Sequence, residues 1–383
     1  MRILFVGGLE AGQTSRMRMI ELQQLGHEVR SVDAFERWNR LAPLSRRIQQ
    51  WRCAGDEVDA LNREVIAAAD GLAPHLVWAE KQEYLRPQTL RTLKRNGAKL
   101  LHYTPDPYFS LPWKRTRLMD ESLPIFDYLV TSKAYEMAEY SELPATVIYV
   151  PLGFSETAHR PLLPSSSKGY SEFSSDVSFL GGWEPRRERI LDLVAHVPGI
   201  KLKIWGYGWD HLADGRLTPR RIFAMRRNAG GESFTIKRNP MLAAAVQGNE
   251  VYGDRYAWAI SAARISLGFL RKICPDQHTT RTFEIPACGS MLLADRTDEH
   301  RAFFEEGREA EFFDSETELL DKLRYYLEHE PERARIAQAG YERCFNSGYS
   351  YRSRVCEIMG KVEESEAAST CSTDAARIAA ASA

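Results

Sequence analysis

One local pattern occurs twice in this sequence and limits what the chain can fold into. Residues 3–8 read ILFVGG and residues 177–182 read VSFLGG, and a segment with helical spacing of apolar residues follows each run. A buried strand, a tight glycine turn and a helix form the opening of a βαβ unit, whose strands are parallel and whose helices cover both faces of the sheet. The repeat predicts an α/β protein with two Rossmann-like, doubly wound domains that face each other across a cleft.

The length of 383 residues suits two such domains. Further strands are predicted at residues 27–33, 75–79, 99–103, 128–131, 146–150, 201–205 and 291–294. Between the halves, the stretch RPLLPSSSKGYSEFSS is rich in Ser and Pro and has too little apolar surface to hold regular structure. The expected organisation is a first domain at 1–158, a linker at 159–175, a second domain at 176–346, a helix at 347–363 that crosses back to the first domain, and a disordered tail at 364–383.

The overall charge does not favour binding to nucleic acid or to a membrane, because 51 basic and 52 acidic residues leave a formal net charge of -1. No apolar run is long enough for a signal peptide or a membrane span. The six cysteines lack the spacing of a zinc site or a disulfide framework, which favours a reducing cytoplasm. We therefore expect no nucleic-acid partner and no membrane span, while peripheral contact with a membrane surface stays open.

Residues 210–248 form a basic excursion from the α/β pattern. Its cationic residues are Arg216, Arg220, Arg221, Arg226, Arg227, Lys237 and Arg238. One interpretation is a platform for an anionic acceptor or a membrane surface. The other, which we favour, is a pair of solvated helices with exposed charges.

The stretch HTTRTFEIPACGS, residues 278–290, carries the most specific chemistry. If Thr282 caps a helix, Glu284 lies in its first turn and Pro286 falls where the missing N–H has no intrahelical partner. The amides of such a terminus attract phosphate, Arg281 adds a charge-assisted bond, and a carboxylate can accept the hydroxyl hydrogens of a ribose. The alternative is that Glu284 only complements the helix dipole.

This stretch opens a longer ordered pattern. It runs R-x-F-E-x-x-A-C-G, an apolar strand with Asp-Arg-Thr, then E-G-x-E-A-x-F-F-D and A-x-x-G-Y. The pattern resembles the C-terminal signature of the CgeB-like, spore-maturation-type glycosyltransferases, which are related to the large retaining GT-B group. The segments DVSFLGGWEPRRERIL, VYGDRYAWAISAARISL, LGHEV and YTPDP are similar to that family too, so the resemblance covers most of residues 1–360.

The resemblance implies a GT-B fold and transfer of a sugar from a nucleotide-sugar donor with retention at the anomeric carbon. Glu284 matches the acid that binds the nucleotide ribose, and Arg281 lies near the diphosphate. Arg186 and Arg187 match the basic position that contacts the diphosphate. The larger group has a second acid seven positions before the first, where this chain has Gln277 beside an Asp.

Cofactor expectations follow from the same residues. Two arginines and a helix N-terminus stabilise a leaving diphosphate without a metal, and no Asp-x-Asp pair for a divalent ion was found in the sequence. We expect no metal site and no tightly bound cofactor. The donor is a UDP-sugar by preference, with GDP- and dTDP-sugars as alternatives.

Other residues are weaker candidates. His102 and Asp106, in LHYTPDPYF, end a predicted strand, and His102 is either a general base or a structural histidine. Gly182 and Thr282 are expected near the donor. Tyr207, flanked by two glycines, is either a stacking platform for the donor or a core aromatic residue.

The sequence thus favours a glycosyltransferase that acts on a saccharide, lipid-linked or other cell-envelope acceptor. A sugar-nucleotide epimerase or hydrolase on the same fold is an alternative, because fold does not fix chemistry. A non-catalytic coat or assembly protein is another, which the missing upstream acid keeps open. The oligomeric state is not predicted.

Overall fold

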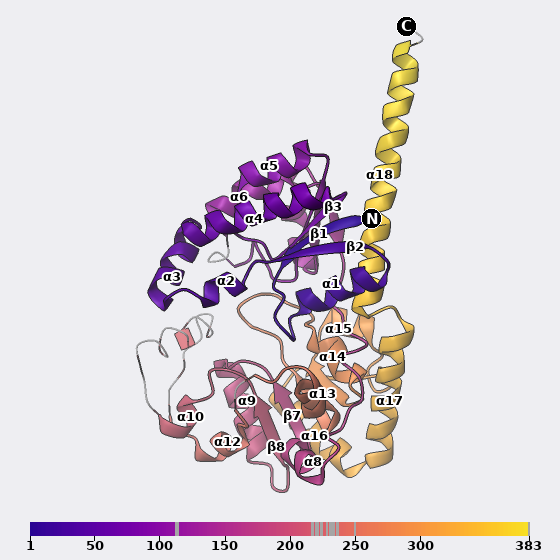
Figure 1. Ribbon diagram of the computed structural model, residues 1–383. Helices are drawn as coiled ribbons and strands as arrows, with labels where there is room; N and C mark the ends of the chain where they lie inside the picture. The colour runs from indigo at the N-terminus through magenta and orange to yellow at the C-terminus, as the bar shows by residue number, and fades with distance from the viewer. Residues whose placement is uncertain are drawn as a thin grey trace. The chain divides into compact units, whose positions relative to one another are not determined.

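The computed structural model describes residues 1–111, 115–215, 218, 222, 225–226, 229, 234, 237–248 and 250–381, with side chains to residue 367 except that of residue 214 (Figure 1). The chain forms two compact units. Unit 1 comprises Met1–Leu152 together with Tyr351–Ala383, and unit 2 comprises Gly153–Ser350. No helix of the described residues combines the length and the apolar character that a membrane crossing requires.

Unit 1 is built on a six-stranded parallel sheet in the order β2-β1-β3-β4-β5-β6. Its strands are β1 Arg2–Gly7, β2 Glu28–Asp33, β3 Leu76–Glu80, β4 Lys99–Thr104, β5 Tyr128–Thr131 and β6 Thr146–Tyr149. Its helices are α1 Thr14–Gln24, α2 Glu36–Asn39, α3 Pro43–Arg52, α4 Asp56–Leu72, α5 Pro87–Arg95, α6 Arg117–Ser122, α7 Met137–Ser141 and α18 Tyr351–Ala381, with two 3-10 turns, Leu123–Ile125 and Ala134–Glu136.

The inner strands of this sheet, β1, β3, β4 and β5, are buried on both faces, which explains their nearly continuous apolar sequences. Leu4 and Val6 of β1 pack into one core with α4 and α5. Ile3 and Phe5 point the other way, into a core that includes Val355 and its neighbours on α18. Helix α18 is therefore a covering helix of unit 1, although it is the last element of the chain.

Unit 2 is built on a five-stranded parallel sheet in the order β11-β10-β9-β7-β8. Its strands are β7 Ser175–Leu180, β8 Leu202–Trp205, β9 Ala263–Gly268, β10 Met291–Asp295 and β11 Glu311–Phe313. Its helices are α8 Ser167–Phe173, α9 Pro185–Ala195, α10 His211–Asp214, α12 Pro240–Ala245, α13 Asp254–Ser261, α14 Arg281–Ala287, α15 Asp298–Phe303, α16 Glu316–Glu328 and α17 Glu330–Asn346.

Each sheet has one point where the strand order reverses, and ligands of doubly wound sheets bind there, beyond the carboxyl ends of the strands. In unit 1 the reversal lies between β1 and β3, and in unit 2 it lies between β7 and β9. The sequence prediction of two parallel α/β sheets is correct.

Three local features differ from the sequence expectations. The stretch predicted to be an irregular linker contains helix α8, because the Ser166 hydroxyl accepts a hydrogen bond from the Gly169 amide and Phe173 is buried. Helix α18 continues through the tail predicted to be disordered, where several alanines favour helix. The N-terminal segment of unit 1 ends at Leu152, six residues before the predicted boundary at 158.

Candidate functional site

An arginine side chain spans the point of strand reversal in unit 2. Arg187, in the first turn of α9, donates from Nη1 to the Gly182 carbonyl at 2.9 Å and from Nη2 to the Phe269 carbonyl at 3.3 Å. These carbonyls belong to the loops that leave β7 and β9. Arg187 therefore ties together the two loops between which a ligand is expected.

The Arg187 guanidinium is enclosed but keeps its charge. The residue is 7 % exposed, and Glu184 Oε1 lies 3.3 Å from its Nη1. Burial lowers the pKa of Arg187 to about 10; Glu184 opposes this, and Arg271 and Arg281 add to it. At neutral pH the side chain is still a cation.

Two further arginines reach the same edge of the sheet. Arg186 forms a bidentate pair with the carboxylate of Asp295, the last residue of β10, and Asp295 Oδ2 also accepts the Leu270 amide at 2.8 Å. Arg281 donates from Nε to the carbonyl of Leu180 at 2.9 Å. The carboxyl ends of β7, β9 and β10 are thus linked by arginines.

This group of four arginines, which we name the arginine cluster, comprises Arg186, Arg187, Arg271 and Arg281. Two carboxylates pair with its members: Asp295 with Arg186, and Glu184 with Arg187 and Arg271. Guanidinium groups gathered beside a helix N-terminus favour a polyanionic ligand.

Helix α9 supplies that N-terminus. It begins at Pro185 and runs for 11 residues, and no side chain caps it. The amides of its first turn have no intrahelical partner, and the positive end of its dipole lies beside the arginine cluster. The free backbone amides of α9 and the side chains of the arginine cluster therefore lie at the same edge of the sheet.

Glycine shapes the loops at this edge. A Cβ on Gly182 would lie 2.5 Å from the ring of Tyr207, so the ring lies directly on the glycine backbone. Gly206 has φ +149, and a Cβ there would lie 2.1 Å from the Gly181 carbonyl. Tyr207 itself is 43 % exposed, which makes it a surface ring and not the core aromatic of the alternative prediction.

Glu284 lies in a buried polar group that the sequence did not reveal. The Tyr256 hydroxyl donates to Glu284 Oε2, and His159 Nε2 lies 3.7 Å from Oε1. The Ser155 amide donates to His159 Nδ1 at 3.0 Å, so a neutral His159 carries its proton on Nε2, toward the carboxylate. Burial raises the pKa of Tyr256 well above its usual value and Glu284 raises it further, so the phenol stays a donor.

The predicted helix cap at Thr282 is wrong. Helix α14 begins at Arg281, and Thr280, two residues before the predicted cap, occupies the N-cap position without a side-chain bond. The Thr282 hydroxyl is buried, where it accepts the Thr279 amide and bonds His300 Nε2 at 2.9 Å. Pro286 consequently lies inside the helix, beyond its first turn, and Thr282 has a structural role.

Gln277 forms hydrogen bonds to the segment at the start of α15. Its Oε1 accepts the Glu299 amide at 3.4 Å, and its carbonyl accepts the Thr297 hydroxyl at 2.7 Å. Both contacts stabilise the start of α15. The neighbouring Asp276 accepts a bond from the Cys274 thiol at 3.2 Å.

The candidates of unit 1 lie at and beyond the carboxyl end of β4. His102 is 3 % exposed and packs on Phe126, and burial lowers its pKa to about 4, an effect that the Gln82 backbone opposes only in part. Neither ring nitrogen makes a hydrogen bond of normal geometry within the described residues. Asp106 forms a half-exposed ion pair with Lys81 at 3.4 Å. His102 therefore has the features of the structural alternative.

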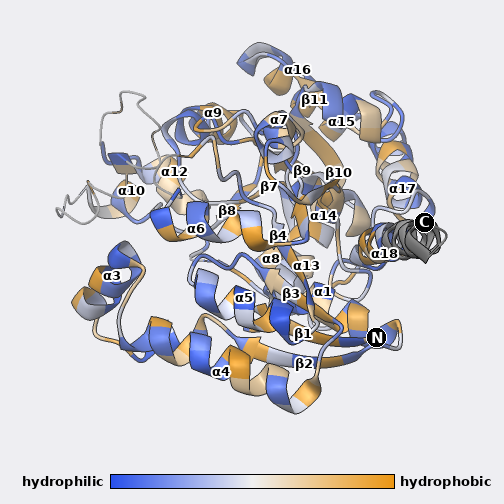
Figure 2. Cartoon of the chain, turned by 90° about the horizontal axis from the view of Figure 1, so that it is seen from above, coloured by the Kyte–Doolittle hydropathy of each residue, from blue (hydrophilic) through white to orange (hydrophobic). Residues whose placement is uncertain are grey.

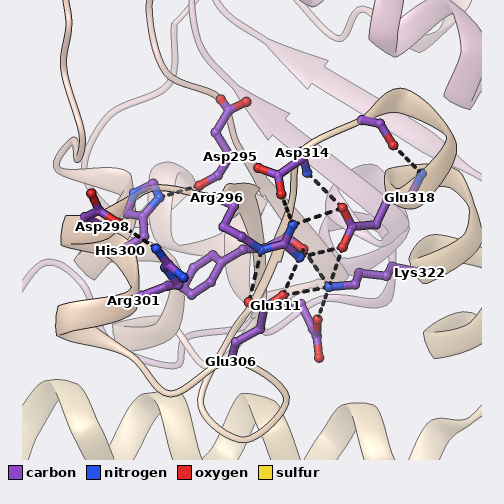
Figure 3. Close-up of polar contacts among 12 residues, drawn as sticks. Asp295, Arg296, Asp298, His300, Arg301, Glu306, Glu311, Asp314, Glu318 and Lys322 are labelled. Atoms are coloured by element: carbon purple, nitrogen blue, oxygen red, sulfur yellow. Dashed lines mark hydrogen bonds and ion pairs between the residues drawn. The ribbon is translucent and has the colours of Figure 1, made fainter.

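An open hollow of about 840 Å³ lies elsewhere in unit 2, beside α16. Figure 3 shows the ion pairs that line it, in which Lys322 contacts Glu306, Glu311 and Glu318. Arg296 pairs with carboxylates of the same group. The carboxylates outnumber these two cations, so the hollow would repel a diphosphate, and we place the candidate site at the arginine cluster.

Two further expectations concern residues outside this site. Within the described parts of the chain, no group of three or more His, Cys, Asp or Glu side chains is placed to hold a metal ion. In the basic excursion, Arg216, Arg220, Arg221 and Arg227 lie outside the described residues. Arg238 is described, and it bonds the Ala213 carbonyl at 3.3 Å.

Comparison with known proteins identifies the fold. Residues 186–360 match the family model described as glycosyl transferase-like. No curated protein sequence matches the chain. Among solved structures, sucrose-phosphate synthase from Thermosynechococcus elongatus is similar with a TM-score of 0.62 at 12% identity, covering 96% of this chain and 99% of that one.

Two further structures are similar over nearly their whole length. HepE of Anabaena, solved with UDP-glucose, has a TM-score of 0.59 at 12% identity and covers 95% of this chain and 100% of its own. An E. coli structure titled trehalose-6-phosphate, bound with UDP-2-fluoro glucose, has a TM-score of 0.58 at 11% identity, with 94% and 98% covered. The chain therefore has the α/β fold of GT-B glycosyltransferases, and its residues 186–360 are similar to the glycosyl transferase-like family.

Proposed function

We propose that this protein is a glycosyltransferase that uses a nucleotide-sugar donor held by unit 2. The observation that carries the proposal is the arginine cluster beside the uncapped start of α9, at the point of strand reversal. The match of residues 186–360 to a glycosyl transferase-like family supports it. Relatives of the fold solved with UDP-glucose and UDP-2-fluoro glucose favour a uridine donor, with GDP- and dTDP-sugars as alternatives.

The cluster members have different roles in this proposal. Arg281 and the first amides of α9 face the diphosphate and stabilise the charge that develops as it departs, while Arg186, paired with Asp295, adds positive charge beside them. Arg187 is a positioning residue, because both of its terminal nitrogens are engaged, by the two loop carbonyls and by Glu184. Gly182 lets the backbone approach the donor, and the exposed ring of Tyr207 stacks on the base or the sugar.

Glu284 receives the ribose hydroxyls in this proposal. In the described part of the chain its carboxylate accepts one hydrogen bond, from Tyr256, and a carboxylate has further acceptor sites. Tyr256 and His159 fix the direction of those sites. On unit 1, Asp106 stays as the proposed acceptor residue, and the buried, neutral His102 is proposed to have a structural role.

The reaction proposed is a transfer with retention that needs no metal. The bond between the anomeric carbon and the diphosphate oxygen breaks, and the acceptor oxygen bonds to the anomeric carbon. The acceptor hydroxyl loses its proton to the departing phosphate, so the products are a glycoside and the protonated nucleoside diphosphate. The arginine cluster replaces a divalent cation in neutralising the leaving group. The proposed acceptor is a hydroxyl of a saccharide, a lipid-linked glycan or another cell-envelope compound.

A nucleotide-binding experiment tests the proposal. Calorimetry with UDP, GDP and dTDP, each with and without magnesium, should show one diphosphate that binds without the metal. Arg281→Gln should weaken that binding roughly 10- to 100-fold, because a hydrogen bond to a charged group contributes about 1.5–3 kcal/mol. Arg189→Gln, an exposed arginine of the same α9, is the matched control.

The other outcomes identify the competing functions. Absence of binding by every nucleotide would contradict the transferase and favour an assembly protein. Release of free sugar at the same rate with and without acceptors would show a hydrolase, and a changed sugar on the recovered donor would show an epimerase. A cytoplasmic location is part of the proposal and is supported by the five described cysteines, all free thiols.

A further inference from the structure

Helix α3 of unit 1, Pro43–Arg52, buries none of its residues. Its large apolar side chains are among the most exposed of the described residues, at 71 % for Leu44, 46 % for Ile48 and 84 % for Trp51. Figure 2 shows hydrophobic and hydrophilic residues side by side along this helix. Exposed apolar residues gathered on one element indicate an interaction surface.

The three apolar residues form a stripe. With about 100° of rotation per residue, Leu44, Ile48 and Trp51 fall within an arc of about 60°. Gln49 lies on the opposite part of the helix, where its side-chain oxygen accepts the Glu57 amide at 3.1 Å. The helix is therefore attached to unit 1 by its polar face, and its apolar stripe points away from that attachment.

Arginines flank the stripe. On the same helical wheel, Arg47 lies about 40° to one side of the stripe and Arg52 about 40° to the other. Both are exposed. The helix has no Asp or Glu, and in the described part of the chain no carboxylate pairs with Arg46, Arg47 or Arg52. An apolar stripe between unpaired cations is complementary to a surface with anionic groups above an apolar layer.

We propose that α3 is an interfacial helix that docks unit 1 on an anionic lipid bilayer. Leu44, Ile48 and Trp51 enter the boundary between the headgroups and the acyl chains, while Arg47 and Arg52 contact lipid phosphates. A second protein copy would cover the apolar stripe equally well, but it would leave the flanking arginines without anionic partners. The charge arrangement therefore favours the lipid surface. The inference is independent of the donor site in unit 2.

Vesicle flotation with the full chain tests this docking. The protein should float with vesicles of phosphatidylcholine and phosphatidylglycerol, and much less with phosphatidylcholine alone. Replacing the stripe in L44S/I48S/W51S should lower the partition coefficient at least about tenfold. The charge variant R47S/R52S should lower the partition coefficient about fivefold for each arginine removed. High salt should lower the partition coefficient of the wild-type protein to a similar extent.

The controls separate docking from misfolding. L163S/M241S removes two other apolar residues, exposed by 52 % and 51 %, and should float like the wild type. Bromine-labelled lipids should quench the fluorescence of Trp51. This quenching must disappear in W51S, and the midpoint of unfolding of that variant should equal that of the wild type. Three results would each overturn the proposal. They are equal binding to both vesicle types, unchanged vesicle binding by L44S/I48S/W51S, and a dimer in solution that L44S/I48S/W51S converts to monomers.

Discussion

The Tyr256 hydroxyl donates a hydrogen bond to Glu284 Oε2 in unit 2, where Glu284 is buried and Tyr256 is partly buried. Tyr256 lies on α13 and Glu284 on α14, 28 residues later in the chain. A buried carboxylate needs such a donor, since loss of its partner leaves a charge without compensation. The bond also limits the directions from which Glu284 can accept a ligand.

Tyr256→Phe should therefore weaken donor binding by roughly tenfold, with a smaller effect on kcat, because the phenol positions the carboxylate and does not contact the reacting atoms. Steady-state kinetics with varied donor measure the split between KM and kcat. Tyr325→Phe removes the same group from a surface pair with Glu332 and should change nothing. Unchanged KM in Tyr256→Phe would refute the positioning role.

Arg187→Lys should slow transfer by roughly 10- to 100-fold although the charge is kept. A lysine cannot bond the Gly182 and Phe269 carbonyls with two separate nitrogens, so the loops after β7 and β9 lose their tie. Turnover at saturating donor is the measurement. Arg189→Lys, two residues along α9 and exposed, should retain wild-type activity; equal rates in the two variants would contradict the role of Arg187.

Gly206→Ala should destabilise unit 2 and abolish nucleotide binding. The new Cβ would lie 2.1 Å from the Gly181 carbonyl, and φ +149 already disfavours a side chain. Thermal unfolding with and without nucleotide is the measurement. Gly199→Ala also has a positive φ, of +82, but nothing lies within 4 Å of its Cβ, so it should show only the backbone cost, about 1 kcal/mol or more.

The pH dependence of stability should reflect His102. Its folded pKa of about 4 lies below the usual value near 6.5, so between these values the unfolded chain binds a proton that the folded chain does not. Stability should fall as the pH falls through this window, by at most about 3 kcal/mol from this residue.

Denaturant unfolding between pH 7.5 and pH 4.5 measures this loss. His102→Leu should lose less stability over the window than the wild type does. His196→Gln changes a half-exposed histidine and serves as the control. The same pH slope in His102→Leu and the wild type would show that another group, such as buried His300 with its pKa of about 4, causes the loss.

The sequence alone determined the alternation of strands and helices. The run of residues 128–131 coincides with β5, and the runs that precede the double glycines lie within β1 and β7. Strands buried on both faces are continuous apolar segments that glycine turns close, and this local signal is readable without neighbours. Two parallel sheets and the loop positions after their strands followed from it.

The tertiary structure decided which polar groups meet. Arg186 pairs with Asp295, 109 residues away in the sequence, and Arg187 donates to the Phe269 carbonyl, 82 residues away. His159 contacts Glu284 from a stretch that was predicted to be a linker. The exposure of Trp51 is likewise invisible in a pattern that a buried amphipathic helix would share. Strand order and helix packing set these neighbours, and burial then fixes the charge state and the accessible atoms of each residue, so single-chain spacing cannot predict them.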